Sequence, residues 1–171
     1  METVKVLVTG DFSSGKTQFI KTLTSDTFST EKRITDIKEA EKKSETTVAM
    51  DYGKLFLEGK AIHLFGTPGQ ERFKFMWDVL DKNKSGFILL VDSTNIENIK
   101  NGANFIDYFY KDNIPFVIGC NKQDLPGALS VNEIKDILSV EGTYLPLVAT
   151  KKDSAITVLR SLIKSLSVAY A

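Results

Sequence analysis

The stretch GDFSSGKT at residues 10–17 constrains this chain more than any other, because it matches the pattern G-x-x-x-x-G-K-[ST]. Val4 to Val8 before it are mostly apolar and β-branched and predict a buried strand, and Gln18 to Leu23 after it place apolar residues at helical spacing. A strand, a glycine-bounded turn and a helix N-terminus direct backbone N–H groups and the helix dipole at one anion. We therefore predict a phosphate-binding loop, in which Lys16 reaches the β- and γ-phosphates and the Thr17 hydroxyl ligates Mg²⁺.

The alternative interpretation of this stretch is a chance match in an ordinary strand-to-helix turn. The flanking strand and helix both argue against chance, because the motif works only in that setting. The residues that we expect to contact the ligand here are Asp11, Phe12, Ser13, Ser14, Gly15, Lys16, Thr17 and Gln18.

Length and composition favour one folded unit. The 171 residues suit a single domain, and a hydrophobic share of 42% is enough for a core. Lys plus Arg and Asp plus Glu both number 22, so no net charge steers the chain to nucleic acid or to an anionic membrane. We predict one domain over residues 1–171 and no nucleic-acid partner.

Membrane and export signals are not expected from this sequence. No run approaches the ~18 apolar residues of a membrane helix, and the N-terminus has no basic or apolar signal segment. Glu2 stands where myristoylation needs glycine, and the C-terminus has no prenylation cysteine, so we expect no stable membrane anchor. The single cysteine, Cys120, permits no internal disulfide and suits a cytoplasmic protein, in which we expect it to pack in the core.

The order of predicted elements indicates an α/β fold. Six strands are expected, at Val4 to Val8, Thr47 to Leu57, Lys60 to Phe65, Gly86 to Asp92, Ile114 to Gly119 and Tyr144 to Val148. A two-residue turn joins the second and third strands, which predicts an antiparallel pair. Helices are expected over Asn104 to Tyr110, from the Ser130 capping box to Leu138, and after a cap at Asp153. This alternation predicts a doubly wound, mostly parallel six-stranded sheet with one antiparallel strand and helices on both faces.

The segment from Thr24 to Glu45 is rich in Ser, Thr, Lys and Glu. Few large apolar residues interrupt it, so we predict a long mobile loop with a short helical piece around residues 34–43. Its charges are explained most simply as a solvated face, although a polar loop of this length in a small domain is often functional.

A second motif, Asn121-Lys122-Gln123-Asp124, follows the predicted strand that ends near Gly119. A carboxylate at position 124 can accept hydrogen bonds from N1 and the exocyclic amine of guanine, whereas adenine presents an acceptor at N1 and would leave Asp124 unpaired. Asn121 would tie this loop to the phosphate-binding loop, and the Lys122 stem would lie over the base. A plain polar turn before Leu125 is the alternative, but the order of the two motifs favours the nucleotide site.

With these motifs in order, the chain resembles the Ras-like small GTPases over essentially its whole length. The resemblance rests on residues 10–17, Thr47, Gly69-Gln70-Glu71-Arg72-Phe73, Asn121 to Asp124 and Ala149-Thr150-Lys151. Residues 69–73 are particularly similar to Rab and Arf relatives. The whole segment from His63 to Phe73, followed by Phe75-Met76-Trp77-Asp78, is more similar to prokaryotic Ras-like GTPases, a group that includes the conservon type, with the gliding-motility group as a more distant relative.

The resemblance implies roles for particular residues. Thr47, or Thr46 as the second choice, would contact Mg²⁺ and the γ-phosphate, and Gly69 would donate its N–H to that phosphate. Gln70 would orient the attacking water; the alternative is a solvated residue at a helix start. Lys16, Thr47 and Gln70 are thus the expected catalytic residues, and Thr17 and Thr47 the expected metal ligands. On the base side the expected contacts are Asn121, Lys122, Asp124, Leu125, Ala149, Thr150 and Lys151, the last three through a backbone N–H to guanine O6.

Two positions depart from the family pattern. Gly66 stands where the family has the Asp of its Asp-x-x-Gly motif, which holds Mg²⁺ through water, so the metal site is one carboxylate short. We expect Mg²⁺ to be held in the GTP state and weakly or not at all with GDP. The gliding-motility relatives also lack this Asp. Phe12 occupies a position that is usually small, where its ring either crowds Gln70 and excludes a partner's arginine or points away from the nucleotide.

These features predict a GTP/GDP molecular switch with slow hydrolysis, which orders residues 24–47 and 67–77 when GTP is bound. The alternatives are a nucleotide-locked scaffold that does not hydrolyse GTP, and a P-loop kinase, which the Asn121 motif disfavours. Partners are expected to be an activating protein or an exchange factor, by resemblance of the roadblock type, and an effector that contacts residues 24–47 and 67–80. The apolar residues from Phe73 to Leu80 either pack a helix on the sheet or expose a partner surface. His63, the only histidine, is expected to be structural.

Overall fold

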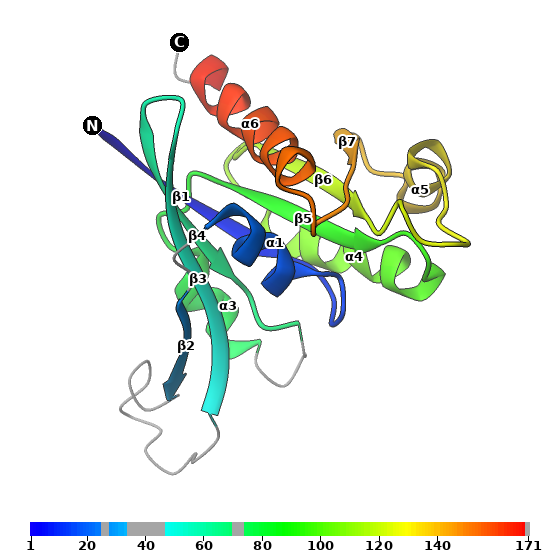
Figure 1. Cartoon of the computed structure of the whole chain (residues 1–171), viewed down its shortest axis with the longest axis horizontal. Coiled ribbons are helices and arrows are strands. Elements are labelled where there is room, and N and C mark those ends of the chain that lie inside the picture. The colour runs from blue at the N-terminus through cyan, green and yellow to red at the C-terminus, as the bar shows by residue number, and fades with distance from the viewer. Residues whose placement is uncertain (25–27, 34–46, 70–73, 170–171) are drawn as a thin grey trace.

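The computed structural model describes residues 1–24, 28–33, 47–69 and 74–169, and within them the chain forms seven strands and five helices (Figure 1). The strands are β1 (Glu2–Thr9), β2 (Phe28–Arg33), β3 (Thr47–Leu57), β4 (Lys60–Gly66), β5 (Gly86–Asp92), β6 (Phe116–Asn121) and β7 (Thr143–Pro146). The helices are α1 (Lys16–Leu23), α3 (Phe75–Asp81), α4 (Ile96–Phe109), α5 (Val131–Leu138) and α6 (Lys152–Ala169).

All seven strands join one sheet in the order β2-β3-β4-β1-β5-β6-β7. The strands β4, β1, β5, β6 and β7 pair in parallel, and β3 runs antiparallel to both of its neighbours. The predicted α/β class, with a mostly parallel sheet and one antiparallel strand, is confirmed. The six predicted strands are all present, and β2 adds a seventh at the edge.

The strand β2 corrects part of the loop predicted for residues 24–45. Its sequence, Phe-Ser-Thr-Glu-Lys-Arg, is polar and has no apolar alternation, so nothing local distinguishes it from a loop. Pairing with β3, which begins far along the chain, makes it a strand, because an edge strand needs a partner on one side only. The helical piece expected at residues 34–43 lies outside the described residues.

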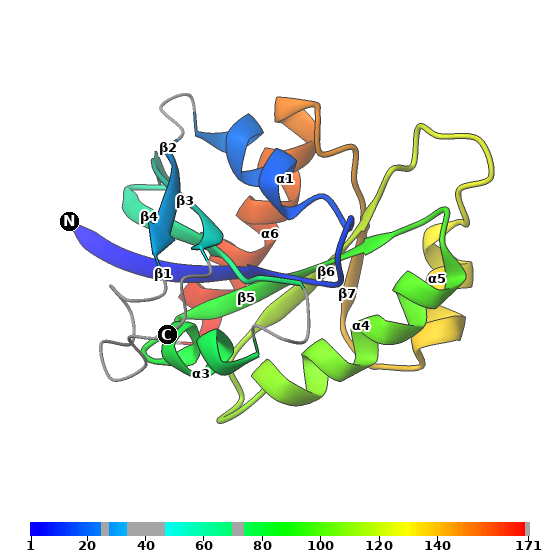
Figure 2. The ribbon, with the colours of Figure 1, turned by 90° about the horizontal axis from the view of Figure 1, so that it is seen from below.

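Helices cover both faces of the sheet, so that its central strands are buried on each side (Figure 2). On one face α1 and α6 pack over alternate residues of β1, among them Val4, Val6 and Val8. On the other face α3, α4 and α5 pack over Leu7 and its neighbours. All of β5 is buried, as its continuous apolar run predicts.

Two helix starts differ from the prediction, and a third agrees with it. The helix α4 begins at Ile96, capped by the Asn95 side chain, and not near Asn104, because polar residues in its first turns hide its periodicity. The capping box of Ser130 and Glu133 is present as predicted. In α6 the first residue is Lys152, so Asp153 lies within the first turn and does not precede the helix.

The apolar segment after residue 74 packs against the sheet. Met76, Trp77 and Leu80 are buried, and Trp77 donates its indole N–H to the carbonyl oxygen of Pro68 at 2.8 Å. The packing interpretation of this segment is therefore confirmed for these three residues, whereas Phe73 lies outside the described residues.

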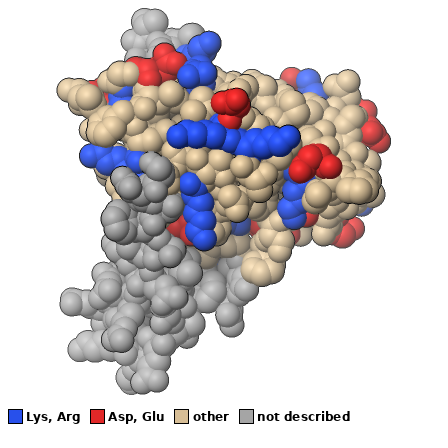
Figure 3. All heavy atoms as spheres, viewed as in Figure 1, with Lys and Arg blue, Asp and Glu red and all other residues tan. Residues whose placement is uncertain are grey.

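Two other side chains have the structural setting that the sequence predicts. Cys120 is buried, and burial raises the pKa of its thiol to about 12. His63 pairs through Nδ1 with the Tyr52 hydroxyl at 2.6 Å. No helix in the described ranges has the length and apolar character needed to cross a bilayer. Acidic and basic side chains are mixed over the described part of the face seen in Figure 3.

Candidate functional site

The turn between β1 and α1 has the backbone of a phosphate-binding loop. Gly10 and Gly15 both adopt positive φ, at 148° and 102°. A Cβ at Gly10 would lie 2.4 Å from the carbonyl oxygen of Leu90, and one at Gly15 would lie 2.2 Å from Nδ2 of Asn121. Both the conformation and the space therefore require glycine here. No side chain caps the N-terminus of α1, and no acidic residue lies in its first turn, so its N–H groups face an open, electropositive position.

Lys16 lies along this loop. Its ammonium donates to the carbonyl oxygens of Gly10 at 2.7 Å and Asp11 at 2.9 Å. Burial lowers the pKa of Lys16 to about 8, against the carboxylates of Asp11 and Asp51, which act to raise it. Gly69 packs beside the Lys16 ammonium, since a Cβ built on Gly69 would lie 3.0 Å from Nζ of Lys16. The structure thus brings Lys16 and Gly69 together, as the resemblance implies.

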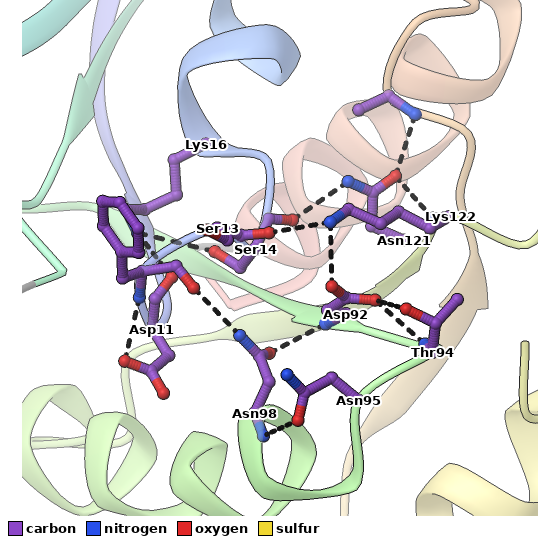
Figure 4. A network of polar contacts seen from close by, with 12 residues as sticks. Asp11, Ser13, Ser14, Lys16, Asp92, Thr94, Asn95, Asn98, Asn121 and Lys122 are labelled. Carbon is purple, nitrogen blue, oxygen red and sulfur yellow. Dashed lines mark hydrogen bonds and ion pairs between the residues drawn. The ribbon is translucent and has the colours of Figure 1, made fainter. Parts of the chain in front are cut away.

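Asn121 joins three loops that are distant in the sequence (Figure 4). Its Nδ2 donates to the carbonyl oxygen of Ser14 at 3.0 Å. Its Oδ1 accepts the backbone N–H groups of Lys122 at 2.8 Å and Ala149 at 3.0 Å. The tie between Asn121 and the phosphate-binding loop is present as predicted, and one buried amide also fixes the loop after β7.

The side chain of Lys122 makes a second bridge to the phosphate-binding loop. Its ammonium donates to the carbonyl oxygen of Ser13 at 3.0 Å and to Oδ2 of Asp92 at 2.8 Å (Figure 4). Burial acts to raise the pKa of Asp92, but hydrogen bonds from Lys122 and Thr94 outweigh it and hold the pKa below the usual value. These two contacts hold the aliphatic stem of Lys122 beside the phosphate-binding loop. The sequence predicts that this stem lies over the base of the nucleotide.

Asn98 is a residue of this network that the sequence analysis missed. From the first turn of α4, its Oδ1 accepts the N–H of Asp92 at 2.8 Å and its Nδ2 donates to the carbonyl oxygen of Phe12 at 3.2 Å. Asn101, one turn further on, donates to the carboxylate of Asp11 at 2.7 Å. No motif contains either residue, so their role appears only when α4 is placed beside the loop.

The residues expected around the base lie at one edge of the site. Asp124, Leu125, Thr150 and Lys151 are exposed there, while Ala149 is buried. The N–H groups of Ala149 and Lys151 already donate to Asn121 and to the carbonyl oxygen of Val148. Within the described residues the N–H of Thr150 has no such acceptor, which makes it the best placed of the three to serve a ligand.

Several predicted residues cannot be placed in the site. Gln70 and Thr46 lie outside the described residues. Thr47 is the first residue of β3, paired with Arg33, and its backbone alone is described. Phe12 is 65% exposed and lines an open cleft of about 890 Å³ between α3, α4 and the phosphate-binding loop.

The corner around Gly66 contains a carboxylate that the sequence analysis did not single out. Asp51 of β3 accepts a hydrogen bond from the Thr17 hydroxyl at 2.5 Å. A Cβ at Gly66 would lie 3.2 Å from Cβ of Asp51. Elsewhere in the described ranges, as here, no group of three or more His, Cys, Asp or Glu side chains is arranged to hold a metal ion. A cation in this corner would therefore need oxygens from hydroxyl groups and from phosphate in addition to the single carboxylate of Asp51.

The fold and the loop define the class as an α/β nucleotide-binding protein of the P-loop GTPase type. A family model described as "Conserved hypothetical ATP binding protein" matches residues 24–167, and the chain belongs to that family. An uncharacterised protein of Methanocaldococcus jannaschii is 36% identical over 131 residues, which cover 77% of each chain.

Two relatives are named GTPase-family members. ADP-ribosylation factor-like protein 2 of Drosophila melanogaster is 25% identical over 142 residues, 81% of this chain and 70% of that protein. Human Ras-related protein Rab-27B is 31% identical over 138 residues, 76% of this chain but 62% of its own length. These relatives support membership of the Ras-like GTPase superfamily; they do not distinguish the conservon or gliding-motility type.

Proposed function

We propose that this protein is a single-domain GTP/GDP switch that hydrolyses GTP slowly to GDP and phosphate. The observation that carries the proposal is the Asn121 junction, where one buried amide holds the Ser14 carbonyl and the Ala149 N–H. It joins the phosphate-binding loop to the two loops proposed for the base, as binding of one nucleotide across all three would require. A nucleotide then lies with its phosphates at α1 and its base beside Asp124 and Thr150.

Guanine is the base that Asp124 favours. A carboxylate accepts from N1–H and the exocyclic amine of guanine, whereas adenine offers an acceptor at N1. The family description names ATP, so base preference is the first point to test. Nucleotide extracted from purified protein should be GDP or GTP, and adenine nucleotide in its place would contradict the proposal.

Mg²⁺ is the expected cation of this site, and the available donors fit it. Thr17 presents a hydroxyl beside the Asp51 carboxylate at the N-terminus of α1, and hard oxygen ligands of this kind suit Mg²⁺. Thr17 and Thr47 would hold the cation together with phosphate oxygens. When bound, the cation would neutralise charge on the phosphates.

Hydrolysis would depend on positioning and on charge more than on covalent chemistry. Lys16 lies at the loop where the β- and γ-phosphates would bind, and Gly69 beside it would donate its N–H to the γ-phosphate. Gln70, the next residue, would orient water for attack on phosphorus. Without a partner's arginine, turnover near ~10⁻⁴ per second is expected.

The test of turnover is phosphate release over hours from GTP-loaded protein, compared with Gln70→Ala. The substitution should lower release and leave GTP affinity nearly unchanged. If the unmodified protein releases no phosphate even with cell lysate added, the nucleotide-locked scaffold becomes the better description. Unchanged release in Gln70→Ala would remove that residue from the mechanism.

Partners of such a switch would be an activating protein or an exchange factor, by analogy of the roadblock type, and an effector. Residues 24–47 and 67–80 are the surfaces proposed for them. A cytoplasmic location is part of the same proposal.

A further inference from the structure

We propose that Asp51 supplies, from the neighbouring strand, the Mg²⁺-anchoring carboxylate that Gly66 cannot provide. The inference rests on the proposed function, since it assigns a residue to the metal of the same nucleotide site. It replaces the expectation of a site that is one carboxylate short, which considered position 66 alone.

Strand pairing places Asp51 at this position. In the antiparallel pair of β3 and β4, Tyr52 is opposite Phe65, so the preceding residue, Asp51, comes beside Gly66. A Cβ built on Gly66 would lie 3.2 Å from Cβ of Asp51 and 3.6 Å from its Oδ2. A carboxylate that starts from β3 therefore occupies the space into which a side chain at position 66 would extend.

The Asp51 carboxylate is also directed at the expected metal ligand. Its Oδ2 accepts from the Thr17 hydroxyl at 2.5 Å, so hydroxyl and carboxylate oxygens share one corner. Asp51 therefore contacts the hydroxyl group that is expected to ligate the cation.

The glycine at position 66 is explained by the same arrangement. Its φ is not in the left-handed region, so the backbone does not require glycine. Space disfavours a side chain, because a Cβ would be 3.2 Å from both Cβ of Asp51 and Cδ1 of Ile20, and these neighbours would have to shift by a few tenths of an ångström. The glycine at position 66 and the carboxylate at position 51 thus belong together in one exchange, because the carboxylate has moved from β4 to β3.

The exchange changes what is expected of the GDP state. Asp51 belongs to a strand and does not depend on the γ-phosphate for its position. We therefore expect Mg²⁺ to remain bound with GDP, and chelation to accelerate GDP release. This outcome is opposite to the one that Gly66 alone predicts.

The test measures Mg²⁺ affinity of the GDP-loaded protein by calorimetric titration, and GDP release with and without EDTA. Asp51→Asn keeps the shape and can still accept from Thr17, so the fold should be retained. It should weaken Mg²⁺ binding at least tenfold and make GDP release nearly independent of EDTA. The matched control is Asp112→Asn in an exposed turn with φ of 55°, which asparagine tolerates, and it should change neither value.

The exchange variant Asp51→Gly/Gly66→Asp returns the carboxylate to β4 and should recover much of the affinity that Asp51→Gly loses. Equal Mg²⁺ affinity in Asp51→Asn and the unmodified protein would overturn the inference and leave Asp51 as a link between β3 and α1. If the protein binds ADP and not GDP, the proposed function fails, and the same titration is run with ADP. Protein that binds neither nucleotide overturns both.

Discussion

The base side and the metal corner of the site are built in different ways. On the base side, Asn121 makes three hydrogen bonds from a buried position and ties together loops that follow β1, β6 and β7. In the metal corner, a partly exposed carboxylate, Asp51, meets one hydroxyl. The base side keeps the family motif residue for residue, whereas the metal corner has lost the motif's Asp.

The difference teaches which parts of such a site can be rebuilt. A buried amide that serves three loops cannot move, because each freed partner would remain buried without a hydrogen bond. A cation needs oxygen at the right place and accepts it from either of two adjacent strands. We therefore expect substitutions on the base side to have large effects, and those at the metal corner and at Lys16 of the adjoining phosphate-binding loop to have smaller, graded ones.

The largest effect is expected from Asp124→Asn. The substitution removes the charged acceptor for two donors of guanine, and hydrogen bonds to charged groups contribute ~1.5–3 kcal/mol each. Affinity for GDP should fall on the order of a hundredfold, and affinity for xanthosine diphosphate should rise. Competition titration with the two diphosphates measures this. Equal affinities for GDP before and after the change would separate Asp124 from base recognition.

Asn121→Ala should be the most destabilising change in the site. It leaves the Ala149 N–H and the Ser14 carbonyl without their partner in a buried position, which costs about 2–3 kcal/mol of unfolding free energy. Urea denaturation of the nucleotide-free protein measures it. Asn132→Ala on the exposed side of α5 is the control and should be nearly neutral. Similar midpoints for both variants would show that the junction is not structural.

Lys16→Ala should weaken GTP binding at least tenfold, because it removes a charge that opposes the β- and γ-phosphates. The measurement is a fluorescence titration with labelled GTP. Thermal melting of the free protein should change little, since Lys16 bonds only to groups of its own loop, the carbonyl oxygens of Gly10 and Asp11 and the Ser14 hydroxyl. Unchanged affinity would exclude the loop as the phosphate site.

The smallest effect expected is a dependence of GTP affinity on pH. Burial lowers the pKa of Lys16 to about 8, so the free protein loses this charge as the pH rises through that value. Phosphates stabilise the charged form, so binding above pH 8 must include proton uptake and weakens several-fold by pH 9. The Lys16→Arg variant stays charged and should not lose GTP affinity as the pH rises. Any protonation change of the nucleotide itself affects both proteins equally. Parallel slopes for the two would contradict the assignment.

Short-range features of the site could be predicted from the sequence. Gly10 and Gly15, with a strand before and a helix after, specify the phosphate-binding loop within about 20 residues, because positive φ and a helix N-terminus are local properties. The motif Asn121 to Asp124 is equally local. The mostly parallel sheet was predicted because segments with strand patterns alternate with segments with helical spacing. The burial of β5 was predicted because its apolar residues form an unbroken run.

Long-range pairings decided the rest. The strand β2 has no apolar pattern of its own and exists through its partner β3. Asn98 looks like an ordinary polar helix residue until α4 places it against Phe12 and Asp92.

Asp51 shows the limit most clearly. In the sequence Asp51 is one of many acidic residues, and Gly66 indicates only that the metal site lacks the carboxylate of the family motif. The register of β3 against β4 puts the two side by side, so that a Cβ built at position 66 would lie 3.2 Å from Cβ of Asp51, and the Thr17 hydroxyl of α1 donates to Asp51. The sequence by itself determined the phosphate loop, the base-side motif and the class of fold, because these depend on local conformation. Tertiary structure alone decided where the metal corner finds its carboxylate, because that depends on which strands pair and in what register.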